Sequence, residues 1–459
     1  MRTVLQRLTL GLCLSVIALL AADGRGQQGF WTDGQPATSP PFRATEGLAF
    51  EPASGLFIMY GGVPDESAAT VYSDTWAFDG CDWMQLFPPV NPGPRFNMYL
   101  TQSPHAGRVV MFGGGVAPYV LDGATWEFDA QTIAWTNVTP AGPSPSPRQL
   151  ANIVYDSVRD RTVLFGGTNE FGSVFYNDTW EWDGAAWQQI TPGGPSPAPR
   201  AWHSMTFDAA RGRTVLFGGY NGSQLGDTWE WDGAQWTQVF SASSPPPQSS
   251  GAIAYDPWSE RVVLFAGSYG WPIGLDATWE YNGANWYLVG ILGGSPPPLY
   301  LQRMEGDPLR GGVLLYGAFG DGWTPVPETW RYHHATLTAD DYAPSPGTTV
   351  QMSLQFRGEG GYRYFTAISL SGTCPGIPLP DGRFIPLNFD GATRLSLNFD
   401  LPAIFMGFHG SLTAAGQAAP ALAIPAQPSL SGVVVSVASW SVSGGIVSTV
   451  SNPLTLVIQ

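Results

Sequence analysis

The feature that most constrains how this chain can fold is a short motif that recurs six times along the sequence. Each copy contains a Thr-Trp step, and the tryptophans of consecutive steps are 49 to 54 residues apart. The steps are Thr75-Trp76, Thr125-Trp126, Thr179-Trp180, Thr228-Trp229, Thr278-Trp279 and Thr329-Trp330. Repeats of this length indicate small structural units that cannot bury their apolar surface alone and therefore stack on their neighbours.

Each copy contains four segments with the composition of short β-strands. A Pro-rich loop leads into the first, and a β-branched and aromatic run ending in glycine forms the second. The Thr-Trp segment is the third, and a second tryptophan begins the fourth. Steps such as Asp183-Gly184 and Asn282-Gly283 separate the third and fourth segments and predict a type I′ hairpin. Four-stranded sheets with two apolar faces bury both faces by stacking radially around an axis.

The composition agrees with short strands and excludes several classes of site. Glycine and proline contribute 57 and 41 residues, which interrupt any long helical pattern. All 20 basic residues are arginine, so the chain lacks the lysine that a Walker-type phosphate loop, a Schiff base or a pyridoxal phosphate site requires. The net charge of −16 makes nucleic acid and anionic membranes poor partners, because an acidic surface repels phosphate groups.

The repeated residues resemble those of kelch-repeat β-propellers, in the superfamily of galactose oxidase-like proteins. The resemblance rests on a double glycine followed by two spaced aromatic residues, and it extends from about Phe30 to His334. The double glycines are Gly61-Gly62, Gly113-Gly114, Gly166-Gly167 and Gly218-Gly219. The fifth and sixth copies depart from the pattern, with Phe265-Ala266-Gly267 and Tyr316-Gly317-Ala318. The resemblance implies an all-β fold in which six four-stranded blades surround an axis.

The sixth copy lacks the second tryptophan that begins a fourth strand. The missing sequence occurs at the other end of the repeat region, where Phe30-Trp31 precedes Pro41-Phe42-Arg43 in the way that Trp187 precedes Pro199-Arg200. We therefore predict that the N-terminal segment supplies the outer strand of the sixth blade and closes the ring, as terminal strands do in related propellers.

The first 26 residues are typical of an export signal peptide. Arg2 and Arg7 give a positively charged start, an apolar run covers residues 8–20, and small residues follow at 21–26. The run is too short to span a membrane comfortably, and no second run of this kind occurs. We expect a mature protein without a membrane span that is secreted, periplasmic or held at the cell surface. The sequence leaves its oligomeric state open.

The tryptophan content marks a domain boundary after the repeats. Eighteen of the 19 tryptophans lie between Trp31 and Trp330, and only Trp440 follows. We predict that residues 27–335 form the propeller and residues 336–459 a C-terminal β-sandwich, because the later segments are β-rich and have Gly and Pro in their turns. This part resembles the terminal β-domain of exported repeat proteins from planctomycete-type bacteria. The resemblance does not point to any particular activity.

Two cysteines lie outside the export signal, Cys81 and Cys374. Two cysteines do not make a disulfide framework, so we expect one or both to be small buried residues, although an exported protein could pair them. Stability is then expected to come from packing.

A partial ring of arginines is the first set of candidate ligand-binding residues. Arg43, Arg95, Arg148 and Arg200 occupy equivalent positions where the chain enters the first strand of four blades. Their guanidinium groups could hold a carboxylate or another polar ligand near the axis. The alternative is an ion pair with an acid of a neighbouring blade, such as Glu127, Glu181 or Glu230.

Aromatic residues in the loops between second and third strands are the second set. These loops emerge on the same face as the arginines, and their aromatics outside the repeat include Tyr119, Tyr220, Trp271 and Trp323. Flat aromatic rings beside guanidinium donors suit a sugar ring, so we predict carbohydrate binding on this face. The alternative is that these side chains pack over the channel.

The sequence therefore predicts an exported, non-catalytic binding protein for an extracellular glycan or protein ligand, with no cofactor or metal. One alternative is a sugar-directed enzyme similar to the sialic-acid mutarotases, in which Glu46, His203 or Glu305 on the first strands could transfer protons. Another is a copper oxidase similar to galactose oxidase, although Tyr332-His333, Cys81 and His409 do not form a ligand pattern. A third is a structural or adhesion protein whose channel is filled by side chains.

Overall fold

A computed structural model shows that the chain is built almost entirely from short, mostly antiparallel strands. The structure describes residues 28–459 apart from 66, 118–119, 171, 271–272, 293, 322–323, 327, 335–336, 340–341, 357–358, 360, 375, 389, 391, 394–395, 397–403 and 407. The predicted export signal therefore lies outside the described residues. Within the described part of the chain, no helix has the length and apolar character of a membrane span.

Six sheets, here called blades one to six, occupy residues 28–334, and in each the main strands follow one another as an antiparallel meander. Blade one contains β2 (Gly47–Glu51), β3 (Leu56–Tyr60), β4 (Thr75–Phe78) and β5 (Trp83–Leu86). Blade two contains β6 (Tyr99–Gln102), β7 (Arg108–Phe112), β10 (Thr125–Asp129) and β11 (Ala134–Asn137). Blade three contains β12 (Asn152–Asp156), β13 (Arg161–Phe165), β14 (Thr179–Trp182) and β15 (Trp187–Ile190). Blade four contains β16 (Ser204–Asp208), β17 (Arg213–Tyr220), β18 (Gln224–Trp231) and β19 (Trp236–Val239). Blade five contains β20 (Ala252–Asp256), β21 (Arg261–Phe265), β24 (Thr278–Tyr281) and β25 (Trp286–Leu288). Blade six contains β27 (Arg303–Gly306), β28 (Val313–Tyr316), β31 (Thr329–His334) and β1 (Gln28–Asp33), with β26 (Gly290–Ile291) parallel to β1.

Short hairpins decorate three of the loops between second and third strands. They consist of β8 (Gly115–Ala117) and β9 (Val120–Leu121), β22 (Ser268–Gly270) and β23 (Ile273–Gly274), and β29 (Phe319–Gly320) and β30 (Thr324–Pro325). In blade four, β17 and β18 are each eight residues long and extend into the same loop.

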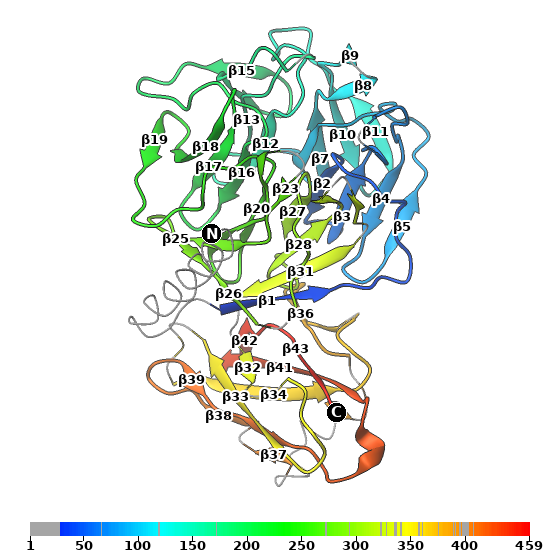
Figure 1. The fold of residues 1–459 in the computed structure, drawn as a ribbon, viewed down its shortest axis with the longest axis vertical. Helices are drawn as coiled ribbons and strands as arrows, with labels where there is room; N and C mark the ends of the chain where they lie inside the picture. The colour runs from blue at the N-terminus through cyan, green and yellow to red at the C-terminus, as the bar shows by residue number, and fades with distance from the viewer. Residues whose placement is uncertain are drawn as a thin grey trace, which may run out of the picture.

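The six blades surround an axis as in a propeller (Figure 1). The first strand of each blade contacts the first strand of the next, in the closed cycle β2, β6, β12, β16, β20, β27 and back to β2. Apolar side chains fill the space between neighbouring blades, as where Phe165 of blade three packs with Leu216 and Trp231 of blade four. Burial of both faces of each sheet explains why each copy has the same apolar pattern.

The N-terminal strand completes blade six, as predicted from the displaced Trp31. β1 pairs antiparallel with β31 and places Trp31 opposite Tyr332. The Trp31 side chain is 4% exposed, and its ring centroid lies 4.7 Å from that of Phe265 and 5.2 Å from that of Tyr332. Two distant parts of the chain therefore close the ring through one shared sheet.

A cycle of side-chain hydrogen bonds links every blade to the next. The indole Nε1 of each fourth-strand tryptophan donates to the hydroxyl of the Thr-Trp threonine in the adjoining blade, over 2.8–3.1 Å. The pairs are Trp31 with Thr278, Trp83 with Thr329, Trp135 with Thr75, Trp187 with Thr125, Trp236 with Thr179, and Trp286 with Thr228. The threonine and the second tryptophan of each repeat are thus explained by contacts between blades.

The hairpins between third and fourth strands contain the predicted glycines but are of another type. In the turn at residues 183–186, Gly184 has a positive φ of 94°, whereas Asp183 does not. Asp183 Oδ1 accepts hydrogen bonds from the N–H groups of Ala185 and Ala186 at 2.9 and 2.8 Å. Glycine with a positive φ at the first central position is typical of a type II′ turn, so the type I′ prediction was wrong. The aspartate lies outside the central pair and caps the turn with its side chain.

Two further sheets that enclose one apolar core form the C-terminal domain. One sheet contains β32 (Leu337–Ala339), β33 (Thr349–Gln355), β37 (Phe405–Met406), β39 (Gln417–Ala418) and β40 (Ala421–Ala423). The other contains β34 (Arg363–Ser369), β38 (His409–Ser411), β41 (Val434–Ser443), β42 (Ile446–Val450) and β43 (Leu454–Val457), and η3 (Pro428–Leu430) precedes β41. Leu354 and Leu422 of the first sheet share the core with Val437 of the second, which is the arrangement of a β-sandwich. The predicted boundary at 335–336 falls outside the described residues and stays a prediction.

The C-terminal domain is attached to turns at one end of blades five, six and one (Figure 1). A hairpin of β35 (Ile377–Pro378) and β36 (Phe384–Ile385) lies beside blade six, where the Phe384 N–H donates to the Leu309 carbonyl at 2.9 Å. Trp258 of blade five packs against an apolar cluster of this domain. Cys374 forms a disulfide with Cys81 of blade one, so the expectation of unpaired cysteines was wrong. The fold brings together residues that are 293 positions apart.

Candidate functional site

The four predicted arginines are buried inside the blades and are at most 2% exposed. Each guanidinium forms an ion pair with an aspartate of its own blade. In three blades this aspartate directly precedes the Thr-Trp step, and in blade two it stands three residues before the threonine; the pairs are Arg43 with Asp74, Arg95 with Asp122, Arg148 with Asp178, and Arg200 with Asp227. Arg148 donates Nη2 to Asp178 Oδ2 at 2.9 Å and Nη1 to the Gly166 carbonyl at 3.0 Å. Burial raises the pKa of the Asp178 carboxyl, but the hydrogen bonds and charge of Arg148, with a hydrogen bond from Trp180, hold it below its usual value.

These contacts correct both interpretations of the arginines. Their guanidinium groups tie strands together within a blade, because the ion pairs and a glycine carbonyl occupy them where a ligand was expected. Their partners are aspartates of the same blade and differ from Glu127, Glu181 and Glu230, the acids named as the alternative. Glu181 and Glu230 pair with Arg159 and Arg211.

The double glycines let neighbouring blades approach closely. Gly166 and Gly167 have φ values of 67° and 97°, and a Cβ atom on Gly166 would lie 2.7 Å from the carbonyl oxygen of Arg200 in blade four. The Gly167 N–H donates to the same carbonyl at 2.9 Å. The arginine position therefore serves two blades, one through its side chain and the other through its backbone.

Backbone hydrogen bonds link neighbouring blades at the end of the axis where the first strands begin, through one residue of each blade; these six residues are here called the belt. The belt residues stand two positions before each first strand and all have φ between 54° and 63°; they are Thr45, Asn97, Leu150, Trp202, Ser250 and Leu301. The Asn97 N–H donates to the Thr45 carbonyl and the Leu150 N–H to the Asn97 carbonyl, both at 2.9 Å. Thr45, Leu150 and Leu301 are also buried, and Leu301 belongs to an apolar cluster with Tyr300 and Phe319.

Of the four predicted loop aromatics, the structure describes Tyr220, which lies beside the belt residue Trp202. Tyr119, Trp271 and Trp323 are outside the described residues. The Tyr220 ring packs against the rings of Phe175 and Trp202, with centroids 6.0 and 6.1 Å apart. Trp202 in turn contacts the apolar cluster of Tyr300 and Phe319. The described aromatics thus pack on one another over the axis.

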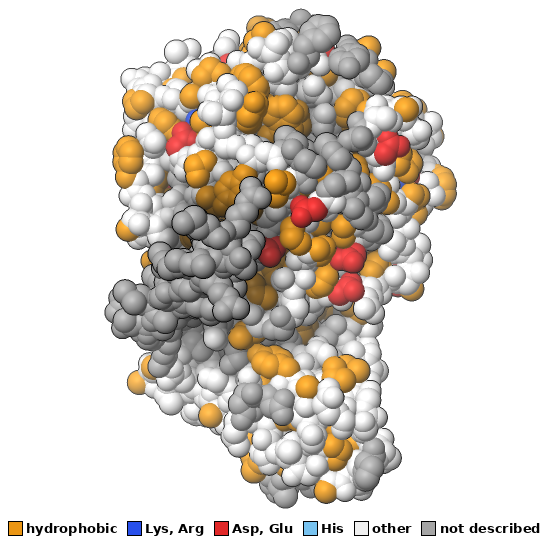
Figure 2. All heavy atoms as spheres, viewed as in Figure 1, with side chains coloured by type: hydrophobic (Ala, Val, Ile, Leu, Met, Phe, Trp, Pro, Cys, Tyr) orange, Lys and Arg blue, Asp and Glu red, His pale blue; other side chains and the backbone are white. Residues whose placement is uncertain are grey.

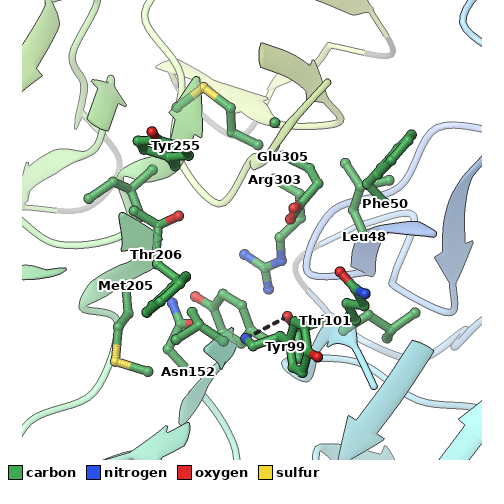
Figure 3. A pocket seen from close by; sticks show the side chains of 18 of the residues that line it. Leu48, Phe50, Tyr99, Thr101, Asn152, Met205, Thr206, Tyr255, Arg303 and Glu305 are labelled. Carbon is green, nitrogen blue, oxygen red and sulfur yellow. Dashed lines mark hydrogen bonds between the residues drawn. The ribbon is translucent and has the colours of Figure 1, made fainter. Parts of the chain in front are cut away.

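A cavity of about 250 Å³ lies on the axis and reaches the opposite end of the propeller. Pro52, Pro257 and Pro308 at its rim belong to turns between first and second strands. Figure 3 shows residues of the first strands that line it, among them Leu48, Phe50, Tyr99, Thr101, Asn152, Met205, Thr206, Tyr255, Arg303 and Glu305. Aromatic, hydroxyl and amide groups around one guanidinium and one carboxyl have the composition of a site for a small polar molecule.

Arg303 brings a positive charge into this cavity (Figure 3). Its Nε donates to the Glu46 carbonyl at 2.7 Å and its Nη2 to the Met98 carbonyl at 3.4 Å, which fixes the guanidinium beside blades one and two. Its Cζ lies 4.1 Å from the centroid of the Tyr99 ring. The guanidinium is therefore positioned by backbone dipoles and an aromatic face.

Two carboxyl groups with raised pKa values accompany Arg303. Glu305 projects from the same strand, and burial raises its pKa to about 8. Glu46 precedes β2, and burial raises its pKa to about 7 although the charges of Arg303 and Arg43 lower it. Neither carboxyl oxygen of Glu46 has a hydrogen-bond partner among the described residues. Groups that titrate near neutral pH can transfer protons or donate hydrogen bonds.

His203, considered with Glu46 and Glu305 as an acid–base group, is buried between blades. Burial lowers its pKa to about 3, so the imidazole is neutral. Its ring packs edge-on against Phe165, and neither nitrogen has a hydrogen-bond partner in the described structure. Of the three groups, Glu305 is the one in the cavity wall.

The residues considered for a copper centre have other partners. Cys81 is in the disulfide, and the Tyr332 hydroxyl donates to Glu280 Oε1 at 2.6 Å. Burial lowers the pKa of His333 to about 3, and His409 lies in the C-terminal strand β38. Across the described residues, no group of three or more His, Cys, Asp or Glu side chains could hold a metal ion.

Arg303 was missed by the sequence analysis, although the repeat contains a signal for it. Arg303 opens the first strand of its blade, and the residues at the same register in the other blades are Gly47, Tyr99, Asn152, Ser204 and Ala252. Arg303 is the charged member of this set. Aligning the copies by strand register, in addition to their motifs, therefore finds it.

Comparison with known proteins identifies the repeat. A family model described as the KLHDC2/KLHL20/DRC7 Kelch-repeats domain matches residues 27–211. Kelch domain-containing protein 2 of Bos taurus is 32% identical over 97 residues, which are 20% of this chain and 22% of that protein. Multiple epidermal growth factor-like domains protein 8 of Homo sapiens is 26% identical over 202 residues, 42% of this chain and 7% of that protein. The chain thus spans less than a quarter of either relative.

A solved structure agrees with the fold. The structure of YjhT is similar over 64% of this chain and 96% of that one, with a TM-score of 0.50 and 14% sequence identity. At this identity the likeness concerns the fold alone. Blades that repeat around an axis and close through a terminal strand define a β-propeller. With the kelch matches, the repeat region of this chain is a kelch-repeat β-propeller, as the double glycines and spaced aromatics indicated.

Proposed function

We propose that this protein is an exported binding protein whose propeller holds a small carbohydrate in its axial cavity. The observation that carries the proposal is the cavity of about 250 Å³ with Tyr99, Thr101 and Asn152 in its wall. Aromatic rings stack on the C–H face of a sugar while hydroxyl and amide groups exchange hydrogen bonds with its hydroxyls. The volume of the cavity suits a small ligand, because cavities that hold drug-sized molecules have volumes of about 300–1,000 Å³.

Two features support the exported part of the proposal. The first 26 residues have the charged start and apolar run of an export signal. The disulfide between Cys81 and Cys374 is of a kind that persists in oxidising compartments. Both agree with a secreted, periplasmic or cell-surface protein that meets glycans outside the cytoplasm.

A glycan-array screen of the mature protein, followed by calorimetric titration of the strongest hit, tests the proposal. Asn152→Leu and Thr206→Val should each weaken binding about tenfold or more, because each leaves ligand hydroxyls without a partner at little change in volume. Phe87→Ala is the matched control, since Phe87 is 80% exposed on blade one. Binding that survives both cavity substitutions but is lost in Tyr220→Ala would move the site to the opposite face and contradict the proposal.

A second candidate function, an enzyme acting on the same class of ligand, is favoured by Glu305. A carboxyl group with a pKa of about 8 holds a proton at neutral pH and can release it, as a general acid–base requires. Arg303 on the same strand could stabilise negative charge that develops on the sugar. NMR spectra of sugars that the protein binds would show accelerated anomer exchange or bond cleavage, lost in Glu305→Gln. Spectra unchanged by the unaltered protein favour binding alone.

A further inference from the structure

We propose that the ligand of the axial cavity carries an oxyanion group, such as a carboxylate, sulfate ester or phosphate ester, which Arg303 binds. This inference rests on the proposed function, because it specifies the class of ligand for the same cavity. Arg303 extends from blade six until its guanidinium lies over Tyr99 of blade two, so it projects into the space that the ligand would fill (Figure 3).

The Arg303 guanidinium has more N–H donors than hydrogen-bond acceptors around it, and its position is fixed by its neighbours. It carries five N–H donors, whereas its acceptors among the described residues are three backbone carbonyls. These are the carbonyls of Glu46, Gln302 and Met98, at 2.7, 3.5 and 3.4 Å. With Tyr99 against one face, the planar group is positioned before a ligand arrives. A rigid fork of this kind binds carboxylate, sulfate or phosphate through two parallel hydrogen bonds.

The other groups around Arg303 leave its charge uncompensated in mildly acidic solution. Glu305 on the same strand and Glu46 before β2 have pKa values of about 8 and 7, raised by burial. Tyr155 on β12 and Tyr255 on β20 are neutral because burial raises their pKa values to about 12. The remaining cation near Glu46, Arg43, is paired with Asp74. At about pH 6 Arg303 and the two carboxyl groups together therefore carry one positive charge, and at about pH 9 Glu305 in the cavity wall and Glu46 behind it add two negative charges.

Protonated Glu305 also contributes to anion binding. A neutral carboxyl group donates one hydrogen bond, whereas an ionised one accepts only and repels an oxyanion. Anion affinity should therefore fall as the pH rises from about 6 to about 9, in the direction set by the two raised pKa values.

Because the rest of the protein is acidic, a preference for anionic over neutral sugars would point to a local contact in the cavity. The net charge is −16, and the face in Figure 2 shows red acidic side chains while blue barely appears. Long-range electrostatics thus oppose the approach of an anion. A preference for an anionic sugar would therefore report a local contact, for which Arg303 is the cation in the cavity wall.

Calorimetric titrations of the mature protein with matched sugars test the inference. The probes are glucose with glucuronate, glucose 6-sulfate and glucose 6-phosphate, and galactose with galacturonate and galactose 6-sulfate. At pH 6 we expect at least one charged sugar to bind about tenfold more tightly than its neutral parent, with the preference falling below about twofold at pH 9. The charged sugar that binds best distinguishes carboxylate, sulfate and phosphate. Arg303→Gln should abolish the preference at pH 6, Arg303→Lys should keep part of it, and Phe87→Ala should keep all of it.

Each outcome decides the inference. Equal affinities for neutral and charged sugars overturn it and leave the proposed function standing. A preference that survives in Arg303→Gln also overturns it, because Arg303 is then not the anchor. Absence of binding by every sugar in the panel overturns both the inference and the proposed function. If Arg303→Gln fails to fold, the comparison of pH 6 with pH 9 on the unaltered protein decides, since a preference that persists at pH 9 contradicts the inference.

Discussion

Replacement of Trp31 by alanine tests whether the N-terminal strand holds the propeller closed. The Trp31 ring is 4% exposed between Phe265 and Tyr332, and its Nε1 donates to Thr278 at 3.0 Å. Truncation of a buried tryptophan costs about 3–5 kcal/mol, of which the lost hydrogen bond accounts for about 1 kcal/mol. We expect Trp31→Ala to lower the free energy of unfolding of the propeller by about 4 kcal/mol.

Guanidinium chloride denaturation followed by near-ultraviolet circular dichroism measures this loss. The transition of the propeller must be fitted separately, because a two-domain chain need not unfold in one step. Phe87→Ala, in the exposed region after β5, is the control and should change stability by less than about 0.5 kcal/mol. A propeller transition in Trp31→Ala that coincides with that of Phe87→Ala would refute ring closure by β1. A chain that starts at Pro36 also loses the backbone pairing with β31 and should be destabilised further.

A double-mutant cycle isolates the hydrogen bond from the packing. Trp31→Phe and Thr278→Val each remove one partner while keeping most of the apolar volume, so their coupling energy should be about 1 kcal/mol. A coupling energy near zero would contradict the bond between blades while leaving the packing of Trp31 intact.

Three further predictions follow from contacts elsewhere in the chain. Arg148→Met should destabilise the propeller by about 3 kcal/mol in urea denaturation at pH 7, because Asp178 is left without its guanidinium; a loss under about 0.5 kcal/mol would contradict a structural ion pair. Glu305 has a pKa raised to about 8, so the folded state holds a proton that the unfolded state releases between about pH 4.5 and 8, and stability should fall as the pH rises through that window. Glu305→Gln should remove that part of the slope in melting temperature against pH, and an unchanged slope would contradict the burial of the carboxyl. Limited proteolysis between the domains should release the propeller only after the Cys81–Cys374 disulfide is reduced, and release without reductant would contradict the pairing.

The blades were predictable because each repeats the same local chemistry. Strand residues such as those of β14 alternate between faces that meet identical neighbours, so one pattern recurs in every copy. The displaced Trp31 was found by the same logic, since a missing strand leaves a gap in a periodic sequence. The Cys81–Cys374 pair joins a turn of blade one to the C-terminal domain, over 293 positions, and cysteine is not one of the repeated residues, so no periodic signal points to it.

The candidate site was predicted less well, because repetition reports packing. Arg148 and its equivalents attracted attention by recurring, yet recurrence reflects the ion pair with Asp178 that every such blade needs. Arg303 occurs once, at a register where other blades have neutral residues, and its partners Glu46 and Met98 come from other blades through backbone carbonyls. Backbone contacts leave no signature in side-chain sequence, so an alignment of the copies by strand register can single out the charge of Arg303 but cannot predict the carbonyl groups that position it.

The disulfide also determines how the molecule would respond to a pulling force. Once the segments before Cys81 and after Cys374 have been drawn out, a load applied to the two ends of the chain passes from residue 81 directly to residue 374 through the sulfur–sulfur bond, and the residues between them bear none of it. Only the segments before Cys81 and after Cys374 can be drawn out. Reduction releases the shielded 293 residues, which at about 3.4 Å per residue adds roughly 1,000 Å of extensible chain. The bond thus acts as a mechanical bypass around the ring, and an oxidised molecule stays short under tension.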